Sequence, residues 1–316
     1  MKTMNFSKLA LAAGLVGLCL FQTSCSSEVK EDIALNSETL TAAVNYPDPP
    51  LTWQEHWFEH NQLVQRVFFD DHLALYFDDD VDTAVTWPNT FLSDVWEYVK
   101  SNYGSFGDDP RLFTILHTGK YSGGHPSTYF DSSHDYRNVI DCGPYTWTDE
   151  TPTGGINMLV HEVGHIVEIA SKGVKSSPAW DIWKDSKWAE IFIYDVYKNL
   201  GKDDFAQEVY DDLMNKYDNF PRQNTQWFKD WFYPIYSQYG EGAVLNNFFE
   251  LLAAHFPKNA SGTEYSRRMN WGEFVHFWSG AAGTDLKPLA QNAFGWSTEW
   301  ENQWVQAKST FNQITY

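Results

Sequence analysis

The segment His161-Glu-Val-Gly-His165 places two imidazoles and one carboxylate within a single five-residue stretch. It lies in a longer run with the i, i+3, i+4, i+7 apolar spacing of a helix with one buried side, made by Ile156, Leu159, Val160, Val163, Ile166, Val167 and Ala170. Side chains four apart on a helix leave the same face about 6 Å apart at Cβ. His161 and His165 could therefore bind one zinc ion with bonds of about 2.0–2.1 Å.

The glutamate between the two histidines has a different task. Glu162 is rotated from His161 by about 100° around the helix, so it reaches a zinc-bound water more readily than the ion itself. The HExxH pattern thus predicts two zinc (Zn²⁺) ligands and a general base. The alternative is two ordinary histidines on a helix flank with a solvated glutamate between them.

A catalytic zinc ion needs a third protein ligand and leaves its fourth position to water. Glu168 lies one turn beyond His165, but a straight helix cannot converge three side chains at that spacing on one ion. Glu168 is therefore expected beside the ligands or in solvent. The longer pattern that ends in a glycine and a third histidine is excluded, because Glu168 and Ser171 stand at those two places.

Carboxylates of the following helix are the remaining candidates for the third ligand: Asp181, Asp185 and Glu190. Asp185 stands where a helix N-cap is expected, which explains it without a metal. Glu190 adjoins the apolar face of its helix, where an unpaired carboxylate would be costly unless it binds a metal ion. Glu190 is therefore the predicted third ligand, with an ordinary surface glutamate as the alternative.

The pattern His-Glu-x-Gly-His followed after 24 residues by Glu190 resembles the gluzincins, which are zinc metallopeptidases. More narrowly, it resembles the enhancin-like branch, whose members include surface lipoproteins that cleave mucin-type glycoproteins. The resemblance covers residues 150–200 and extends to residues 270–289, whereas the N-terminal third has no family match. It implies a zincin-like fold, zinc bound by His161, His165 and Glu190, and Glu162 as the base.

Peptide hydrolysis by such a site would also need a donor for the oxyanion that forms on the scissile carbonyl. Tyr194 lies four residues after Glu190 and so faces the same way on the helix. Tyr197 and His276 are further candidates for this donor. Aromatic residues at helical spacing more often belong to a core, which is the alternative for each of them.

Two other functions remain open at this point. The chain could be a glycan- or protein-binding surface lipoprotein with a vestigial zinc site, because 15 Trp and 17 Tyr could stack on sugars, although an aromatic-rich core also accounts for them. It could instead be a metal-dependent amidase acting on a non-peptide bond. A structural zinc site commonly contains cysteines, and the sequence has no cysteine cluster, which favours catalysis. The expected partner is a protein or glycoprotein substrate.

The first residues have the features of an export signal. Lys2 and Lys8 precede a 13-residue run of apolar and small residues, 9–21, which is too short to span a bilayer. A small residue then precedes Cys25, and a Ser- and acid-rich stretch follows it. This resembles a bacterial lipoprotein signal, although Gln22 replaces the usual leucine. Residues 1–24 are the expected signal peptide, with a plain secretory signal as the alternative.

Composition narrows the expected partners and location. Lipidation at Cys25 would anchor the protein to the bacterial cell envelope, at the outer membrane or cell surface, through a tether of residues 25–50. The net charge of −20 argues against nucleic acid and anionic membrane surfaces as partners. Of three cysteines, only Cys142 lies beyond the lipidation site, so we expect no internal disulfide and a buried Cys142. The protein is expected to be a monomer.

Residues 51–316 are expected to form one α+β domain, β-rich over 51–150 and helical over 151–316, with the zinc helix at the join. We predict a hairpin of residues 63–69 and 73–77, a helix from Pro88 to Gly104, strands at 111–117 and 137–142, and a loop at 119–126. Further helices are predicted at 156–170, 186–200, 203–217, 225–238, 241–255, 270–281, 285–294 and 298–311. Residues 137–142 or 127–130 could form the strand at the edge of the cleft, where an extended substrate can pair with it. The aspartates at 78–82 indicate a solvated loop rather than a calcium loop.

Overall fold

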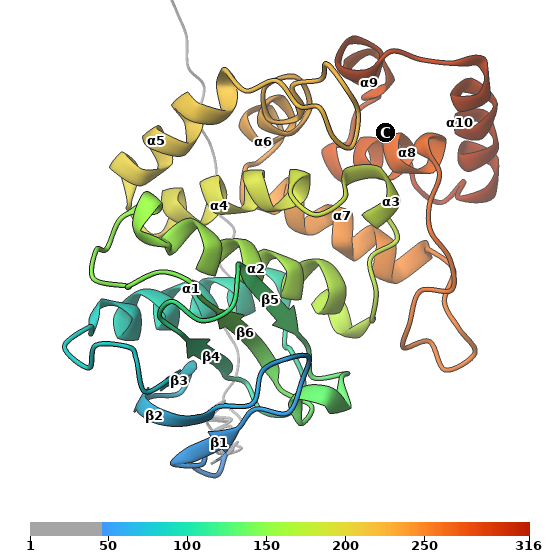
Figure 1. Cartoon of the computed structure of the whole chain (residues 1–316). Coiled ribbons are helices and arrows are strands. Elements are labelled where there is room, and N and C mark those ends of the chain that lie inside the picture. The colour runs from blue at the N-terminus through green and yellow to red at the C-terminus, as the bar shows by residue number, and fades with distance from the viewer. Residues whose placement is uncertain (1–45) are drawn as a thin grey trace, which may run out of the picture. The chain divides into compact units, whose positions relative to one another are not determined.

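Short runs of β-branched and aromatic residues form one six-stranded sheet in the N-terminal third of the part that the computed structural model describes, residues 46–316 (Figure 1). The strand order is β1-β2-β3-β4-β6-β5. The strands are β1 (Thr52–Gln54), β2 (Leu63–Phe69), β3 (Leu73–Phe77), β4 (Leu112–Leu116), β5 (Gly124–Ser127) and β6 (Asn138–Cys142). The hairpin β2–β3 and the strands β4 and β6 confirm the predictions from sequence.

The centre of the sheet is parallel and its borders are antiparallel. Strands β3, β4 and β6 run in the same direction, so their carboxyl ends meet at one edge of the sheet. All residues of these three strands are buried, as expected for strands covered on both faces. Strand β6 is internal, because β4 pairs with one side of it and β5 with the other.

Strand β5 corrects the sequence analysis in two respects. The loop predicted at 119–126 gives way to a strand from Gly124, which pairs antiparallel with β6. Residues 137–142 cannot form the cleft edge because they are internal, and the edge strand is β5 itself. The sequence Gly-His-Pro-Ser has little intrinsic strand preference, so its conformation comes from pairing with β6.

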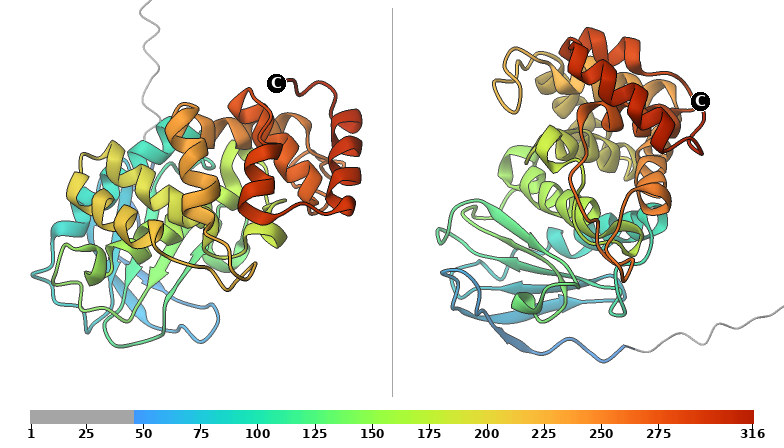
Figure 2. Two further views of the ribbon diagram at one scale, coloured as in Figure 1. Left: turned by 90° about the horizontal axis from the view of Figure 1, so that it is seen from above. Right: turned by 90° about the vertical axis from the view of Figure 1, so that its right-hand side faces the viewer.

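Two helices cover one face of the sheet, as the views in Figures 1 and 2 show. They are α1 (Trp87–Tyr103) and α2 (Ile156–Ala170), and both were predicted from their apolar periodicity. Their buried side chains share a core with Leu75, Ile140 and Cys142 of the sheet. The opposite face carries a smaller core that includes Trp57, Tyr76 and Ile115.

The remainder of the chain is helical, as predicted. After the short helix α3 (Trp180–Trp183) come α4 (Lys187–Asn199), α5 (Asp203–Met214), a π-helical turn at Phe228–Phe232, α6 (Tyr233–Gln238), α7 (Gly242–His255), α8 (Trp271–Ala282), α9 (Lys287–Phe294) and α10 (Thr298–Thr310). Residues 46–316 therefore form an α+β unit with α2 at the join. None of the helices in this part of the chain has both the length and the apolar character needed to cross a bilayer.

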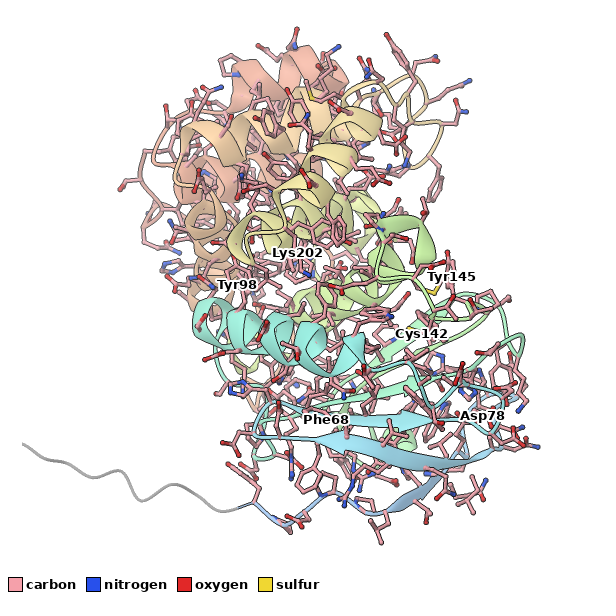
Figure 3. All side chains as sticks on the ribbon, turned by 90° about the vertical axis from the view of Figure 1, so that its left-hand side faces the viewer. Phe68, Asp78, Tyr98, Cys142, Tyr145 and Lys202 are labelled. Atoms are coloured by element: carbon pink, nitrogen blue, oxygen red, sulfur yellow. The ribbon has the colours of Figure 1, made fainter. Side chains whose placement is uncertain are left out.

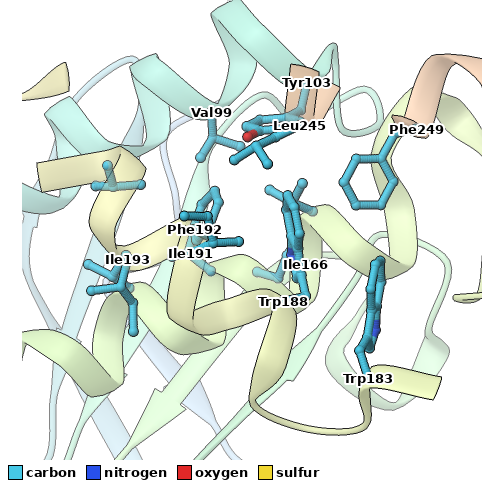
Figure 4. Close-up of a cluster of buried hydrophobic side chains, with 14 of the residues drawn as sticks. Val99, Tyr103, Ile166, Trp183, Trp188, Ile191, Phe192, Ile193, Leu245 and Phe249 are labelled. Atoms are coloured by element: carbon cyan, nitrogen blue, oxygen red, sulfur yellow. The ribbon is translucent and has the colours of Figure 1, made fainter. Parts of the chain in front are cut away.

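An aromatic core fixes α4 against α2 (Figure 4). Trp188 stacks on Trp183 at a centroid distance of 5.7 Å and meets the edge of Phe249 at 4.9 Å. Gly164 of α2 allows the two helices to approach closely, because a Cβ at that position would lie 2.9 Å from the ring of Phe192. The position of α4 is thus set by packing along its buried face.

The aspartate-rich loop after β3 contains an ion-pair network. Lys120 Nζ lies 2.8 Å from Asp78 Oδ2, 2.7 Å from Asp79 Oδ1 and 3.3 Å from Asp80 Oδ2. Lys120 therefore occupies the position between the carboxylates that a calcium ion would take and offsets part of their charge. The predicted signal peptide (1–24), the lipidation site Cys25 and most of the tether lie outside the described residues.

Candidate metal centre and active site

Helix α2 brings the two predicted histidine ligands together. His161 Nε2 and His165 Nε2 are 3.0 Å apart. Asp185 completes a cluster: its Oδ1 lies 3.5 Å from His165 Nε2 and its Oδ2 lies 3.8 Å from His161 Nε2. Ligand atoms of a tetrahedral zinc ion with bonds of about 2.0–2.1 Å are about 3.3 Å apart, so these three side chains fit such an ion.

The role assigned to Asp185 from sequence needs correction. The N-cap of α4 is Ser186, and no side-chain hydrogen bond caps that end of the helix. The Asp185 side chain is instead turned towards the histidines and is 72% exposed. This exposed carboxylate, on the turn between α3 and α4, leaves the cluster open to solvent on that side.

Glu190, the predicted third ligand, lies in a different environment. Its Oε1 accepts hydrogen bonds from Lys187 Nζ at 2.7 Å and from Lys216 Nζ at 2.8 Å. The cost of burying this carboxylate, which was the reason for assigning it to zinc, is therefore offset by two ammonium groups. The structure groups Asp185, and not Glu190, with the two histidines.

Glu168 holds one of the histidines in position. It is buried, and its Oε2 lies 3.1 Å from His165 Nδ1, while its Oε1 accepts hydrogen bonds from Ser177 Oγ and Trp183 Nε1. A carboxylate on Nδ1 directs the Nε2 lone pair of His165 towards the cluster, as partners of metal-bound histidines commonly do. Glu168 therefore lies beside the ligands, which is one of its two expected positions.

Burial and neighbouring charge shift the pKa values at this site. Burial, with help from the charge of His165, lowers the pKa of His161 to about 4. Burial also opposes charge on His165, but Asp185 and Glu168 outweigh it and raise the pKa of His165 to about 10. Burial, reinforced by Asp185, raises the pKa of the Glu162 carboxyl to about 7. A metal ion binds neutral imidazole and would replace the proton on His165.

Glu162 lies against the edge strand. It is 5% exposed, and a Cβ on Gly124 of β5 would lie 2.8 Å from its Cγ and 3.0 Å from Cys142 Sγ. Only a glycine allows the strand to pass so close to the carboxylate. Within residues 46–316, no strand pairs with the outer side of β5, so the open edge of the sheet borders the candidate base.

A cavity of about 540 Å³ opens beside His161. Its wall includes Ser186 and Glu190 from the α4 region and Glu208 and Asp212 from α5. Glu190 thus belongs to the lining of a space next to the histidine pair, together with Lys216, one of the two lysines that pair with it. The cavity and the edge strand β5 are the two surfaces that a bound molecule could use.

The three candidate oxyanion donors have other contacts. Tyr194 packs against four rings, those of Tyr210, Phe228, Tyr233 and Tyr236. Tyr197 Oη donates a hydrogen bond of 2.6 Å to Asn157 Oδ1, and Asn157 lines the same cavity as His161. His276 Nδ1 lies 2.9 Å from Tyr316 Oη near the C-terminus. The aromatic cluster around Tyr194 gives no support to its predicted role.

Comparisons with known proteins bear on the fold. No family model and no curated protein matches the sequence. Among solved structures, a functionally unknown conserved protein from Bacillus anthracis str. Ames matches at 13% identity and a TM-score of 0.50, over 76% of this chain and 50% of that one. The present chain therefore spans about half the length of that protein, and the likeness concerns the fold alone.

Two peptidases also match at lower TM-scores. Legionella pneumophila aminopeptidase A, in complex with aspartic acid, is 13% identical with a TM-score of 0.43, over 69% of this chain and 26% of that chain. An M1 zinc metallopeptidase mutant from Deinococcus radiodurans, bound to a Tyr-Ser-Ala substrate, is 12% identical with a TM-score of 0.33, over 81% and 57% of the two chains.

Proposed function

We propose that this chain is a zinc-dependent peptide hydrolase with a zincin-like catalytic domain, in which an aspartate takes the place of the glutamate ligand of the gluzincins. His161, His165 and Asp185 hold the zinc ion, and Glu162 is the general base. The observation that carries the proposal is the convergence of two Nε2 atoms 3.0 Å apart with the carboxylate of Asp185, next to a buried glutamate on the same helix.

The chain's own groups divide the work of the reaction. When bound, Zn²⁺ supplies a Lewis acid that polarises the scissile carbonyl and acidifies water. Glu162 takes the proton from the attacking water and delivers it to the leaving amine. Glu168 keeps His165 oriented throughout.

The open edge of β5 favours an extended polypeptide as substrate. A peptide can add to an exposed strand edge through backbone hydrogen bonds, and side-chain pockets then give selectivity. Because Gly124 lies against Glu162, a peptide bound along this edge would lie beside the base, and the cavity next to His161 has room for one of its side chains. These surfaces support peptide hydrolysis over an amidase that acts on a small non-peptide bond.

The substrate class and location in this proposal rest on the sequence. The resemblance to the enhancin-like branch makes mucin-type glycoproteins the first substrates to examine. The lipoprotein-like segment ending at Cys25 supports action outside the cytoplasm, on an enzyme anchored by lipid to the cell envelope.

Metal removal tests the proposed function. Dialysis against a zinc chelator should abolish cleavage of a peptide library and of mucin glycoproteins, and added Zn²⁺ should restore it, because the base alone cannot polarise the carbonyl. Cleavage by the metal-free chain would contradict the proposal. Glycan binding without cleavage by the zinc-loaded chain would instead support a vestigial site.

The close approach at Gly124 gives a second expected result. Gly124→Ala should displace the Glu162 side chain and lower kcat by about 10–100-fold, because small displacements of a catalytic group are costly. Zinc content should not change, since the atoms nearest to the new methyl group belong to Glu162 and Cys142. Steady-state kinetics and metal analysis measure both effects, with exposed Ser122→Ala as the control. Unchanged kcat would show that Glu162 need not occupy its present position.

A further inference from the structure

A second group of ligand-type side chains lies at the carboxyl ends of the parallel strands. His117 follows β4 and Asp141 lies in β6, while Glu55 and His60 come from the segment between β1 and β2. All four are between 0% and 6% exposed. In the β5–β6 pair, Gly124 and Cys142 share the face towards α2, whereas Asp141 points to the opposite face. The group is therefore separated from the His161 site by the sheet.

Distances within this group are short. His117 Nε2 lies 2.9 Å from Glu55 Oε1 and 3.0 Å from Asp141 Oδ1. His60 Nδ1 lies 2.7 Å from Asp141 Oδ2 and 3.6 Å from Glu55 Oε1. Nevertheless, one atom from each residue is buried and lacks a hydrogen bond of acceptable geometry: Glu55 Oε1, His60 Nδ1, His117 Nε2 and Asp141 Oδ1.

Four buried polar atoms that lie near charged partners but lack a well-directed hydrogen bond are costly in one place, because poor geometry recovers little of the lost hydration. One ligand atom from each of the four residues lies within 4.8 Å of the others. Atoms that are close together but do not direct donors at acceptors have the arrangement of ligands around a common centre. Although this site has no cysteine, two imidazole nitrogens and two carboxylate oxygens are zinc-ligand atoms and could fill the four positions of a tetrahedral ion.

Neighbouring side chains fix the ring orientation of both histidines. His117 Nδ1 lies 2.8 Å from Asp78 Oδ2, and Asp78 in turn accepts a hydrogen bond from Lys120. Figure 3 labels Asp78 at the end of the sheet where β3 finishes. The His60 ring stacks on Tyr121 with centroids 3.4 Å apart. A carboxylate on Nδ1 leaves the Nε2 lone pair of His117 free for a metal ion.

The two carboxylates are also oriented by neutral donors. Asp141 Oδ2 accepts a hydrogen bond of 2.9 Å from Trp57 Nε1, and Glu55 Oε2 accepts one of 2.9 Å from the backbone N–H of Gln62. Among the described residues, no lysine or arginine forms an ion pair with either carboxylate. With neutral imidazoles, the two negative charges would balance one divalent cation.

We propose that Glu55, His60, His117 and Asp141 bind a divalent transition-metal ion of the zinc class at a closed, structural site. The ion ties the 55–60 segment to the ends of β4 and β6, and β6 in turn holds the edge strand β5. This site shares no residue with the proposed catalytic centre and does not depend on the proposed function.

The test uses a full-length chain in which the catalytic ligands are removed by His161→Ala and His165→Ala. After loading with excess Zn²⁺ and desalting, this variant should retain about one zinc per chain. Adding His60→Gln should reduce the metal content to near zero, while adding His56→Gln, an exposed histidine on the same segment, should not. Cobalt substitution should give the visible absorption of a tetrahedral ion in the first and last of these variants only.

Thermal unfolding adds a readout that does not depend on how well the His60 variant folds. In the His161→Ala/His165→Ala chain, a chelator should lower the Tm by roughly 10 °C, and Zn²⁺ should restore it, because the ion binds the folded state. A folded double variant that holds no zinc would overturn the proposal. Zinc that persists after His60→Gln would also overturn it, since the ion would then lie elsewhere.

Discussion

Glu162→Gln should lower kcat by about 10²–10⁴-fold and leave the zinc content unchanged. Glutamine keeps the size of the side chain, so its packing against Gly124 remains. It cannot accept a proton from water, and the reaction loses its base. Single-turnover cleavage of a fluorogenic peptide, together with metal analysis of the same preparation, measures both quantities.

A matched control for this variant is Glu250→Gln, because Glu250 is a surface residue that pairs with Lys172 and lies outside the site. Its activity should equal that of the wild type. Glu162→Gln with full activity and full zinc would remove Glu162 from the mechanism, whereas loss of zinc would show that Glu162 supports metal binding instead. The zinc measurement therefore separates a chemical role from a structural one.

Asp185→Asn should weaken zinc binding at the His161 site by at least about 100-fold, more than is typical for partners that only orient a ligand. The amide keeps the shape of the side chain but loses the negative charge that a divalent ion needs. Glu190→Gln should leave zinc binding unchanged, since Glu190 pairs with lysines. Competition titration with a chromophoric chelator gives the two affinities.

Glu190→Gln should change the stability of the fold rather than zinc binding. Lys187 would keep its ion pair with Asp218, at 2.6 Å, but would lose its ion pair with the carboxylate at position 190. Because this lysine is buried, the free energy of unfolding should fall by about 1–3 kcal/mol. The reverse pattern, with zinc lost in Glu190→Gln and kept in Asp185→Asn, would restore the third ligand expected from sequence. The pair of variants thus decides between the two carboxylates.

Local patterns made most of the fold predictable. The helices α1, α2, α4 and α7 each carry an apolar stripe that is complete within its own sequence, so periodicity identified them. Strand β5 could not be predicted in this way, because Gly124 and Pro126 disfavour a strand unless a partner such as β6 imposes one.

The candidate ligands depended on tertiary structure to different degrees. His161 and His165 are four apart on one helix, so their spacing alone defined the pair. Asp185 reaches the two histidines through the turn between α3 and α4. The sequence suggested Asp185 as the N-cap of α4, but the N-cap is the next residue, Ser186. Glu190 was predicted as the third ligand because an unpaired buried carboxylate would be costly. The lysine that offsets this cost, Lys216, is distant in the sequence, so local patterns could not predict the ion pair.

The open edge of β5 also bears on self-association. An unpaired strand edge is a template on which a second copy of the same chain can polymerise. Here the edge is four residues long, and Pro126 offers no N–H to an incoming strand. Such an edge can hold a short peptide transiently but cannot extend a continuous ladder between molecules. The features that make β5 difficult to recognise from sequence therefore also protect the protein against aggregation.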